Sequence, residues 1–542
     1  MLIFYKNFKS DIITLGVLSL IYFLIIFKYG SYFTNVIIDI GRELYYPELM
    51  LKGKLLYKDL FNLFGPLGYQ INCLLYRLLG VKISSLLVAG EICSFFILYL
   101  AYFISRYFLN VTNSFICCLF FMTTCIFNVS VFNFIFPYSF SLLYAYLFFL
   151  SSILCFLYVF KYSNKNIFLV LSYFFLGVSI SSKYEYIPFV LILLFYTIFV
   201  FKKNIKDLLL CLFAFILVPV ISYGILFFDG VSIVDLLKNQ ELVLTHIHSK
   251  SLYYFYTHST GTYFSLDLFN KFLSSGLEFK VLFFLLPYLV YGIFIYMLIY
   301  KLYTKSFNLK TDTLFVLVLI AIISMLKTAF FIDIDLYGNY TILLPLVAFL
   351  AFVIKISKNM YKCLKEIFFI IFIILFLSIS YYSVQKVIYI FNNNSQIKTE
   401  KGVIYDAKQN VELTKVLLEY LKRNISDNKS LLVLPEGVMI NYITGYDMKL
   451  YNYYSLLPTF IDTFGIDKIL TDIENAKIDY ILLVNNRSLQ EYGGTFLNCN
   501  ALTYMFMTGN EKAICNFLVN KYQKQKVFYF DSVPIYSLYE RN

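Results

Sequence analysis

The sequence predicts an α-helical polytopic membrane protein with about eleven transmembrane helices, followed by a small extracytoplasmic α/β domain. Of the 542 residues, 60% are hydrophobic and only 14% are charged, against about a quarter charged residues in ordinary soluble domains. Aromatic residues contribute 20%, and the mean hydropathy is +0.73. This composition excludes disordered, collagenous and disulfide-stabilised proteins, which leaves an integral membrane protein.

Eleven segments are long and apolar enough to be spans, each of which needs about 20 mostly apolar residues. They are residues 11–29, 84–108, 114–131, 139–160, 166–182, 186–201, 208–228, 281–303, 313–332, 338–356 and 367–384. Lys6 and Lys9 precede the first segment, and no small-residue cleavage site follows it. We therefore expect a retained membrane anchor rather than a signal peptide.

The distribution of charge orients these segments. With the N-terminus in the cytoplasm, the Lys and Arg residues of the short loops lie on the inner side, and Lys183 is the exception on the outer side, as the positive-inside rule predicts. Residues 1–384 carry 28 basic and 17 acidic side chains, whereas residues 385–542 carry 17 and 16. The formal charge of +12 therefore reflects membrane topology and gives no support to nucleic acid as a partner.

An odd number of spans places the chain after residue 384 outside the cytoplasm, together with two long loops at 30–83 and 229–280. We divide the chain into a membrane domain, 1–384, and an extracytoplasmic domain, 385–542. In the second domain an amphipathic run precedes an apolar run, a Pro-Glu-Gly turn and three further strand-like runs: VELTKVLLEYLKR, SLLVL, IDYILLV, KVFYF and PIYSLY. This order is typical of an α/β domain. Cys499 and Cys515 also lie here, and their pairing is left open.

The first outer loop, 30–83, interleaves charged residues with aromatic and aliphatic ones. This pattern predicts short amphipathic helices on the membrane surface, separated at Gly65-Pro66. For each charged side chain of the loop, the alternative is a solvated position without a specific role.

The same loop carries a set of motifs in a fixed order. Asp39 follows the first span. After it come, in order, a Gly, a Tyr-Lys-Asp, a Gly-Pro-Leu-Gly-Tyr and a closing Leu-Leu-Gly. This order resembles the first extracytoplasmic loop of polytopic C-type (GT-C) glycosyltransferases, in their protein mannosyltransferase-like and aminoarabinose transferase-like bacterial branches. The resemblance covers residues 39–188 best.

The resemblance implies a polyprenyl-phosphate-linked sugar donor, action on the outer face of a bacterial inner (cytoplasmic) membrane, and Asp39 as the catalytic carboxylate. One motif differs from the mannosyltransferase branch. Its Asp-Glu doublet is replaced by Asp39-Ile40, and the next acid is Glu43. The resemblance therefore does not imply a class of acceptor.

Glycosyl transfer from a lipid phosphate needs a base for the acceptor hydroxyl proton and positive charge for the departing phosphate. Asp39 suits the first role, because partial desolvation at a membrane boundary makes a carboxylate a stronger base. Lys183 and Lys327 suit the second, because isolated cations near the ends of spans are costly and usually functional. The alternative for Lys183 is an ion pair with Glu185. Further phosphate candidates are Arg42 and Lys58.

Other polar residues complete the candidate substrate site. They are Glu43, Asp59, Glu91, Glu185, Tyr337 and Asn339. An intramembrane carboxylate such as Glu91 pairs with a lysine, binds a sugar hydroxyl or is protonated, and the sequence leaves these open. His246 and His248 form a His-x-His pair, but no third ligand at a suitable spacing completes a metal site. We therefore predict no metal ligands and no cofactor, and dependence on a divalent metal is left open.

Together these features predict a glycosyltransferase that moves a hexose or pentose from a polyprenyl-phosphate donor to an extracytoplasmic glycan, lipid or protein. Asp39 is the expected general base, and the C-terminal domain caps the cavity or helps to select the acceptor. One alternative is a non-enzymatic flippase or transporter of lipid-linked glycans, and another is a glycan polymerase or ligase. The ionisable groups gather at the outer ends of the spans rather than at mid-bilayer depth, which favours surface chemistry over transport.

Overall fold

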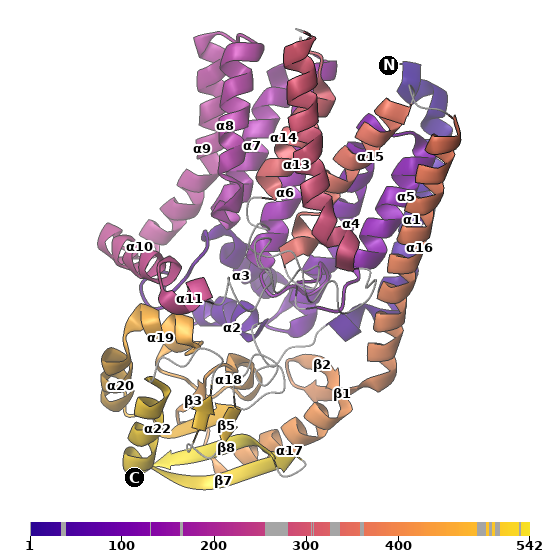
Figure 1. Ribbon diagram of the computed structural model, residues 1–542. Coiled ribbons are helices and arrows are strands. Elements are labelled where there is room, and N and C mark those ends of the chain that lie inside the picture. Colours follow the sequence, from indigo (N-terminus) through magenta and orange to yellow (C-terminus); the bar gives the residue numbers. More distant parts are fainter. Residues whose placement is uncertain are drawn as a thin grey trace.

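The computed structural model describes residues 2–33, 40–130, 132–162, 166–254, 280–304, 306, 308–325, 337–357, 362–484, 495–497, 501–503, 510–530 and 533–542. Its long helices form a bundle, and the α/β part of the chain packs against one end of this bundle (Figure 1). Shorter helices, among them α2 (Ile40–Leu51) and α3 (Leu67–Leu79), lie at the level where the two parts meet (Figure 1).

The bundle consists of the helices that the apolar runs predict, and each predicted segment overlaps one of them. They are α1 (Leu2–Tyr29), α4 (Ile83–Phe108), α5 (Val111–Phe121), α6 (Phe140–Lys161), α7 (Asn166–Ser182), α8 (Pro188–Phe195), α9 (Ile205–Phe228), α13 (Lys280–Tyr303), α14 (Thr313–Ser324), α15 (Leu343–Ser357) and α16 (Lys362–Asn393). The π-helical turns η2 (Met122–Ile126) and η4 (Tyr196–Val200) extend α5 and α8.

Within the described parts of the chain, four helical stretches are long and apolar enough to cross a membrane by themselves. They are Phe8–Phe33, Ile83–Phe108, Phe140–Lys161 and Ile205–Phe228. The fold is thus that of a helical membrane protein with a small C-terminal sheet, and the number of eleven spans stays a prediction.

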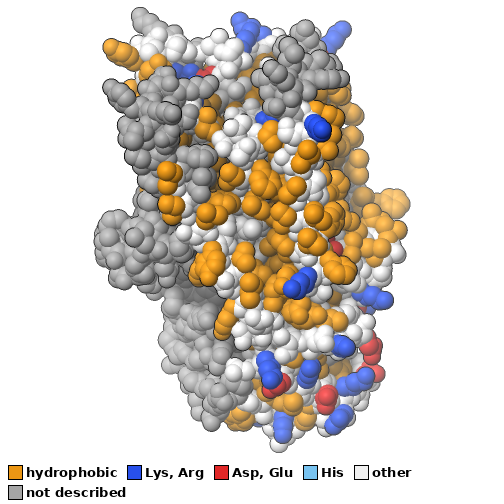
Figure 2. Space-filling model, turned by 90° about the vertical axis from the view of Figure 1, so that its right-hand side faces the viewer, with side chains coloured by type: hydrophobic (Ala, Val, Ile, Leu, Met, Phe, Trp, Pro, Cys, Tyr) orange, Lys and Arg blue, Asp and Glu red, His pale blue; other side chains and the backbone are white. Residues whose placement is uncertain are grey.

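The bundle turns apolar side chains outward as well as inward. On α9, Phe213 is 64% exposed and Val220 is 60% exposed, whereas the outer face of a helix in a soluble protein is polar. Figure 2 shows hydrophobic side chains over much of the helical part on one face, with the charged side chains mainly toward its two ends. Such an outer surface is suited to lipid rather than to water.

A buried ion pair joins α1 to α4. The Arg106 Nε atom lies 2.7 Å from Asp11 Oδ1, and the Tyr102 hydroxyl donates to the same oxygen at 2.5 Å. Arg106, at the end of the predicted span 84–108, is buried. Pairing with Asp11 offsets the cost of burying this charge at the end of a span.

The first outer loop separates into α2 and α3 at Gly65-Pro66, as predicted. The expectation that both helices lie on the membrane surface is wrong for α2. Its side chains from Ile40 to Leu49 are buried, because α18 (Val438–Thr444) of the C-terminal part packs against it. Helix α3 does expose an apolar edge, where Leu78 is 70% exposed.

The C-terminal part is the predicted α/β unit. After the hairpin of β1 (Asn394–Thr399) and β2 (Gly402–Ala407) comes α17 (Lys408–Asn424), which is the predicted amphipathic run. The main sheet has the order β3-β4-β8-β7, with β3 parallel to β4 and the other neighbours antiparallel. Its strands are β3 (Leu431–Leu434), β4 (Tyr480–Val484), β7 (Tyr522–Phe530) and β8 (Val533–Arg541), which match the four predicted apolar runs.

Shorter elements complete this unit. They are the turn η7 (Tyr451–Tyr453), helices α19 (Pro458–Phe464), α20 (Ile466–Asn475) and α22 (Asn510–Lys521), and the hairpin of β5 (Thr495–Leu497) and β6 (Ala501–Thr503). Cys515 lies in α22 and is buried. Cys499 lies outside the described residues, so its pairing with Cys515 stays open.

The two parts of the chain are tightly joined. Helix α16 continues past residue 384 to Asn393 and leads directly into β1. Gly41 of α2 meets α18 so closely that a Cβ atom there would lie 2.5 Å from the backbone nitrogen of Met439. Lys401, in the β1–β2 turn, forms an ion pair with the buried Glu48 of α2, and its ammonium group lies 4.2 Å from the centre of the Tyr442 ring.

The second outer loop begins with α10 (Ile233–Ile247) and α11 (Lys250–Tyr254). A capping box between Ser232 and Asp235 starts α10, and such a box satisfies backbone donors that a helix leaves open. Both helices pack against α19 of the C-terminal part. Residues 255–279 of this loop, including His258, lie outside the described residues.

Candidate active site

The candidate site is built around the first turn of α2, directly after Asp39 in the sequence. Asp39 itself lies outside the described residues, so its role as a base stays a prediction. The neighbouring residues Arg42 and Glu43 are both buried, with 3% and 0% of their surfaces exposed. Two adjacent buried charges need specific partners to be stable there, and the structure provides them.

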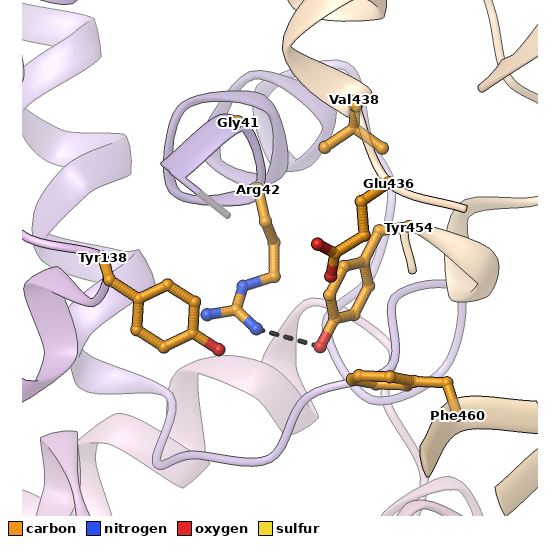
Figure 3. Close-up of a pocket in the computed structure, with 8 residues that line it drawn as sticks. Gly41, Arg42, Tyr138, Glu436, Val438, Tyr454 and Phe460 are labelled. Atoms are coloured by element: carbon orange, nitrogen blue, oxygen red, sulfur yellow. Dashed lines mark hydrogen bonds between the residues drawn. The ribbon is translucent and has the colours of Figure 1, made fainter. Parts of the chain in front are cut away.

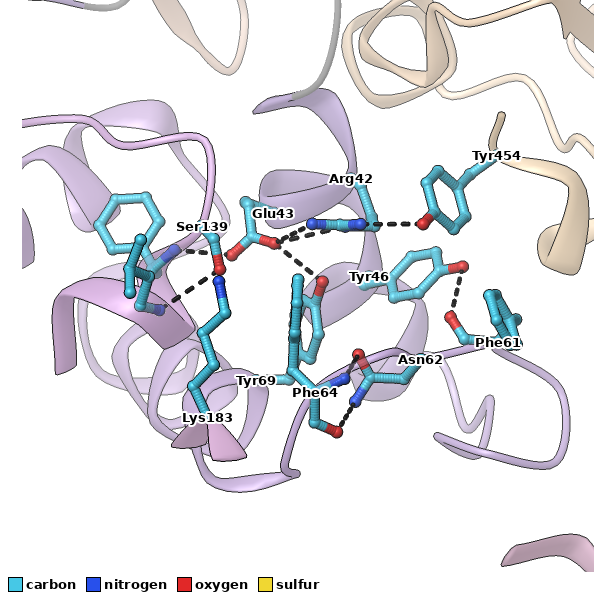
Figure 4. A network of polar contacts seen from close by, with 12 residues as sticks. Arg42, Glu43, Tyr46, Phe61, Asn62, Phe64, Tyr69, Ser139, Lys183 and Tyr454 are labelled. Atoms are coloured by element: carbon cyan, nitrogen blue, oxygen red, sulfur yellow. Dashed lines mark hydrogen bonds and ion pairs between the residues drawn. The ribbon is translucent and has the colours of Figure 1, made fainter. Parts of the chain in front are cut away.

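Glu43 accepts hydrogen bonds from three directions (Figure 4). Its Oε1 atom lies 3.0 Å from Arg42 Nη2 and accepts from the Tyr69 hydroxyl at 2.8 Å, and its Oε2 atom accepts from the backbone N–H of Phe140 at 2.9 Å. Burial raises the pKa of the Tyr69 hydroxyl well above its ordinary value, which keeps it a donor. These contacts fix the carboxylate of Glu43 between α2, α3 and the start of α6.

Arg42 points from α2 toward the C-terminal part of the chain (Figure 3). Its Nη1 atom donates to the Tyr454 hydroxyl at 2.9 Å, and its guanidinium carbon lies 5.0 Å from the Tyr454 ring and 5.3 Å from the Tyr138 ring. Glu436, from the predicted Pro-Glu-Gly turn, lies beside it (Figure 3). A cavity of about 20 Å³ adjoins the guanidinium group, which is room for about one water molecule.

Lys183 enters the same region from the end of α7. Its ammonium group points toward Ser139 and Glu43 (Figure 4) and lies 3.1 Å from Glu185 Oε1. The side chain of Lys183 is only 3% exposed, and that of Glu185 is 24% exposed. The predicted ion pair therefore exists, but the cation is buried within the site and does not extend to solvent.

The motif Gly-Pro-Leu-Gly-Tyr holds these elements together. A Cβ atom on Gly65 would lie 2.1 Å from the backbone oxygen of Ser181 in α7, and one on Gly68 would lie 2.1 Å from Ser141 Oγ in α6. Only glycine permits such close approach of two backbones. The two glycines thus allow α3 to pack closely against α6 and α7. This packing brings Tyr69 into contact with Glu43, and it brings Lys183 into the same region.

Phe64, which the sequence analysis did not single out, connects the two cations. The Lys183 ammonium lies 4.5 Å from the centre of its ring, and the Arg42 guanidinium carbon lies 5.3 Å from it. Asn62 fixes this residue, because its side chain accepts from the Phe64 N–H at 3.2 Å and donates to the Phe64 oxygen at 2.8 Å. An aromatic ring attracts cations to its face, so Phe64 holds Arg42 and Lys183 near one another.

Tyr69, Tyr138 and Tyr454 are further site residues that the sequence analysis did not assign. With 51 tyrosines in the chain, composition does not distinguish these three. The position of Tyr69 within the glycine motif is the signal that does so. Tyr138 and Tyr454 carry no such signal, because tertiary packing brings them to Arg42, Tyr138 from the loop before α6 and Tyr454 from the C-terminal part.

Other predicted residues lie elsewhere. Lys58 and Asp59 line a second cavity, described below, and Asp59 Oδ2 accepts from the backbone N–H of Leu55 at 2.8 Å. Glu91 is half-buried in α4, where a Cβ atom on Gly30 would lie 2.8 Å from its Oε1 atom. None of these three is among the residues that contact Arg42, Glu43 or Lys183 in the described structure.

Two further predicted residues lie near the end of the described bundle. Asn339, in the turn η6 (Tyr337–Tyr340), is fully buried and donates to the backbone oxygen of Phe132 at 3.2 Å. It is thus satisfied within the loop before α6. Tyr337 begins the same turn, and its side chain is not described. Lys327 lies outside the described residues.

The histidines of the second outer loop occupy separate environments. His246 is buried, with Nδ1 3.0 Å from Thr463 Oγ1 and its ring 4.8 Å from that of Phe460. The exposed His248 contacts the Leu244 backbone oxygen through Nδ1 at 2.8 Å. In the part of the chain that the structure describes, no group of three or more His, Cys, Asp or Glu side chains is arranged to hold a metal ion.

The arrangement places two buried cations, each paired with a carboxylate, in a sheltered place. Two buried cations from distant segments are held by hydrogen bonds and by one aromatic ring, next to a carboxylate that is itself fixed. Preorganised charge of this kind stabilises an anion without reorganisation, and it acts more strongly where water is excluded. The site is therefore suited to an anionic group such as a phosphate at the boundary between bundle and C-terminal part.

Comparison with solved structures identifies the fold. The apo oligosaccharyltransferase of Archaeoglobus fulgidus is similar with a TM-score of 0.52 and 11% identity, over 89% of this chain and 70% of that one. The same enzyme tethered to an acceptor peptide is similar with a TM-score of 0.51 and 10% identity, over 99% and 74%. ArnT from Cupriavidus metallidurans, bound to undecaprenyl phosphate, is similar with a TM-score of 0.50 and 10% identity, over 97% of each chain.

These structures are GT-C glycosyltransferases, and at such low identity the likeness concerns the fold. The chain therefore has the GT-C fold, which confirms the resemblance seen in the first outer loop. No family model matches the sequence, and no curated protein is similar enough to it to count as a match.

Proposed function

We propose that this protein is a membrane glycosyltransferase that transfers a hexose or pentose from a polyprenyl-phosphate donor to an extracytoplasmic glycan, lipid or protein. One observation carries the proposal: Arg42 and Lys183 are both buried on the ring of Phe64, next to Glu43. The GT-C fold adds support, because one structure with this fold contains undecaprenyl phosphate. In the same proposal, the chain lies in a bacterial inner membrane with its N-terminus in the cytoplasm.

In this mechanism the acceptor hydroxyl oxygen attacks the anomeric carbon of the donor sugar. Asp39 takes the hydroxyl proton, the bond between the anomeric carbon and the phosphate oxygen breaks, and the lipid phosphate leaves with the electron pair. Arg42 and Lys183 stabilise the negative charge that develops on the departing phosphate. Glu43 contributes by holding Arg42 in place, and residues 385–542 supply Tyr454 to the same guanidinium group.

Binding of the lipid phosphate tests the role of the cations. We expect Lys183→Gln to weaken binding of undecaprenyl phosphate by about tenfold or more, because a charge-assisted contact in a desolvated site is lost. Native mass spectrometry of the purified chain measures this affinity. Lys82→Gln is the matched control, because Lys82 is exposed at the start of α4. Equal affinity in the Lys183 variant and the control would contradict the assignment.

Product analysis tests the reaction itself. Membranes that contain the protein and a polyprenyl-phosphate sugar should release free polyprenyl phosphate when an acceptor is present, and Asp39→Asn should abolish this release while the protein remains inserted. A transporter would release no lipid phosphate, and a polymerase or ligase would release a lipid pyrophosphate. Full activity of Asp39→Asn would exclude Asp39 as the base.

A further inference from the structure

A second cavity lies on the other side of the segment that carries Tyr454. It has a volume of about 320 Å³, in the range of small-molecule binding sites, about 300 to 1,000 Å³. The first outer loop, α10 and the C-terminal part all contribute to its wall. Lysines from two of these segments line it, namely Lys54, Lys58, Lys449 and Lys468.

The side chains that line this cavity carry a net positive charge, which can bind an anionic ligand. Lys54, Lys58 and Lys468 form no ion pair with any residue that the structure describes, and Lys58 and Lys468 are exposed. Two carboxylates also line the cavity, but each already accepts from a protein donor. Asp59 accepts from the Leu55 N–H, and Asp472 accepts from the Tyr453 hydroxyl. The carboxylates are thus held in the wall, and the four lysines of the lining outnumber these two carboxylates.

Aromatic side chains form part of the same wall, namely those of Tyr451, Tyr453 and Phe464. The Lys54 ammonium lies 4.7 Å from the centre of the Tyr451 ring. A ring face accepts the apolar C–H side of a sugar, and an ammonium group beside it binds a carboxylate or phosphate. Aromatic faces together with ammonium groups therefore fit a sugar that carries negative charge better than a neutral sugar or a simple anion.

The second cavity is physically connected to the candidate active site. Tyr453 lines the cavity, and the hydroxyl of the next residue, Tyr454, accepts from Arg42. The Tyr46 hydroxyl of α2 lies 3.1 Å from the Tyr451 oxygen and 3.2 Å from the Phe61 oxygen, and its one proton is shared between them. The ring of Phe61 in turn lies 5.2 Å from that of Phe464. One packed segment, which carries Tyr451, Tyr453 and Tyr454, therefore connects the cavity to the candidate active site.

We propose that this cavity binds an acidic saccharide unit of the acceptor, a sugar that carries a carboxylate or a phosphate. Its role as an acceptor site rests on the proposed function, whereas the binding of an acidic saccharide does not. The inference narrows the acceptor from glycan, lipid or protein to an anionic glycan. The cations of the cavity hold one unit of this glycan while its terminal hydroxyl reaches the donor.

Binding of defined oligosaccharides tests the proposal. The probe is tetragalacturonate, and the matched neutral probe is its methyl ester, which keeps the sugar rings and removes the charge. We expect the full-length chain in nanodiscs to bind the acid at least about tenfold more tightly than the ester. Lys54→Gln combined with Lys468→Gln should lower the affinity for the acid by about tenfold and leave that for the ester unchanged. Isothermal titration calorimetry measures both.

Lys408→Gln combined with Lys415→Gln is the control variant, because both lysines are exposed on the C-terminal part and neither lines the cavity. Equal losses in the two double variants would overturn the proposal, as would equal affinity for acid and ester. Glycerol 1-phosphate at equimolar concentration should not displace tetragalacturonate, and displacement would assign the cavity to phospholipid headgroups instead.

The same variants separate this proposal from the proposed function. Lys54→Gln combined with Lys468→Gln should retain undecaprenyl phosphate binding, and Lys183→Gln should retain tetragalacturonate binding. If the wild-type chain binds tetragalacturonate but not undecaprenyl phosphate, the glycosyltransferase assignment fails and the acidic saccharide site remains. The reverse pattern contradicts the saccharide site alone.

Discussion

At the scale of single residues, the site depends on a carboxylate that neutralises its neighbour in the chain. Glu43 and Arg42 are adjacent in sequence, and both are buried, so neither charge can be lost without leaving the other uncompensated. Sequence analysis included both residues as candidates, but it treated them as ligands for substrate. In the structure both carboxylate oxygens of Glu43 accept from protein donors, namely Arg42, the Tyr69 hydroxyl and the Phe140 N–H, which supports a positioning role.

We expect Glu43→Gln to lower the free energy of unfolding by about 3 kcal/mol, because the Arg42 guanidinium would remain buried without its counter-charge. Tyr69→Phe removes one hydrogen bond to the same oxygen and should cost about 1 kcal/mol. Thermal unfolding in detergent compares the two variants. A Glu43→Gln protein no less stable than Tyr69→Phe would show that other groups near Arg42 already balance its charge.

At the scale of elements, close backbone contacts and a buried histidine decide how helices meet. Gly65 allows the loop before α3 to contact the end of α7. The buried His246 of α10 packs against Thr463 and Phe460 of α19. The sequence marks the first contact, because a Gly-Pro pair interrupts an amphipathic run. It does not mark the second, because His246 resembles a metal ligand as much as a packing residue until its neighbours Phe460 and Thr463 are known.

Gly65→Ala should destabilise the protein strongly, because the added methyl group would lie 2.1 Å from the Ser181 oxygen and the loop would have to move. The expected displacement also carries Phe64 away from Lys183, so affinity for undecaprenyl phosphate should fall. Gly16→Ala is the control, because nothing lies within 4 Å of that position. Similar unfolding temperatures for the two variants would disprove the role of Gly65.

The packing of α10 on α19 should depend on pH. Burial lowers the pKa of His246 to about 4, against about 6.5 for an unfolded histidine. The unfolded state therefore binds more protons between these values, and stability is complete above pH 6.5 and is lost as the pH falls toward 4. At about 1.4 kcal/mol per pH unit the loss reaches roughly 3 kcal/mol.

Hydrogen exchange of α10 at pH 7 and pH 4.5 measures this loss as a smaller protection factor at the lower pH, once each rate is corrected for the intrinsic exchange rate of amides at that pH. His246→Phe is the matched control, since its ring cannot be protonated and can still pack on Phe460. If both proteins show the same pH dependence, protonation of His246 is not the cause.

At the scale of the whole molecule, the C-terminal part completes the site as well as covering it. It contributes Tyr454 to Arg42 and packs α18 against Gly41. The ion pair between Lys401 and Glu48 fastens the β1–β2 turn to α2. Movement of the C-terminal part relative to the bundle would therefore alter the surroundings of Arg42.

Lys401→Met removes this ion pair and keeps most of the apolar length of the side chain. We expect a loss of about 1 to 2 kcal/mol, less than for a fully isolated pair, because Lys52 also lies 2.9 Å from Glu48. Hydrogen exchange in α2 and α18 should rise together. Lys52→Met, which removes the more exposed partner, should have a smaller effect, and the opposite order would contradict a fastening role for Lys401.

The sequence by itself determined the class of protein, the positions of the bundle helices, of α17 and of the four strands of the main sheet, and the interruption at Gly65-Pro66. Those properties follow from local hydrophobic periodicity and from turn chemistry, which act over a few residues. Tertiary structure alone decided which charges meet. Arg42 and Tyr454 are 412 positions apart, and Lys183 reaches Phe64 only because two glycines let α3 approach α6 and α7. Close packing sets such contacts, and no period in the sequence encodes them.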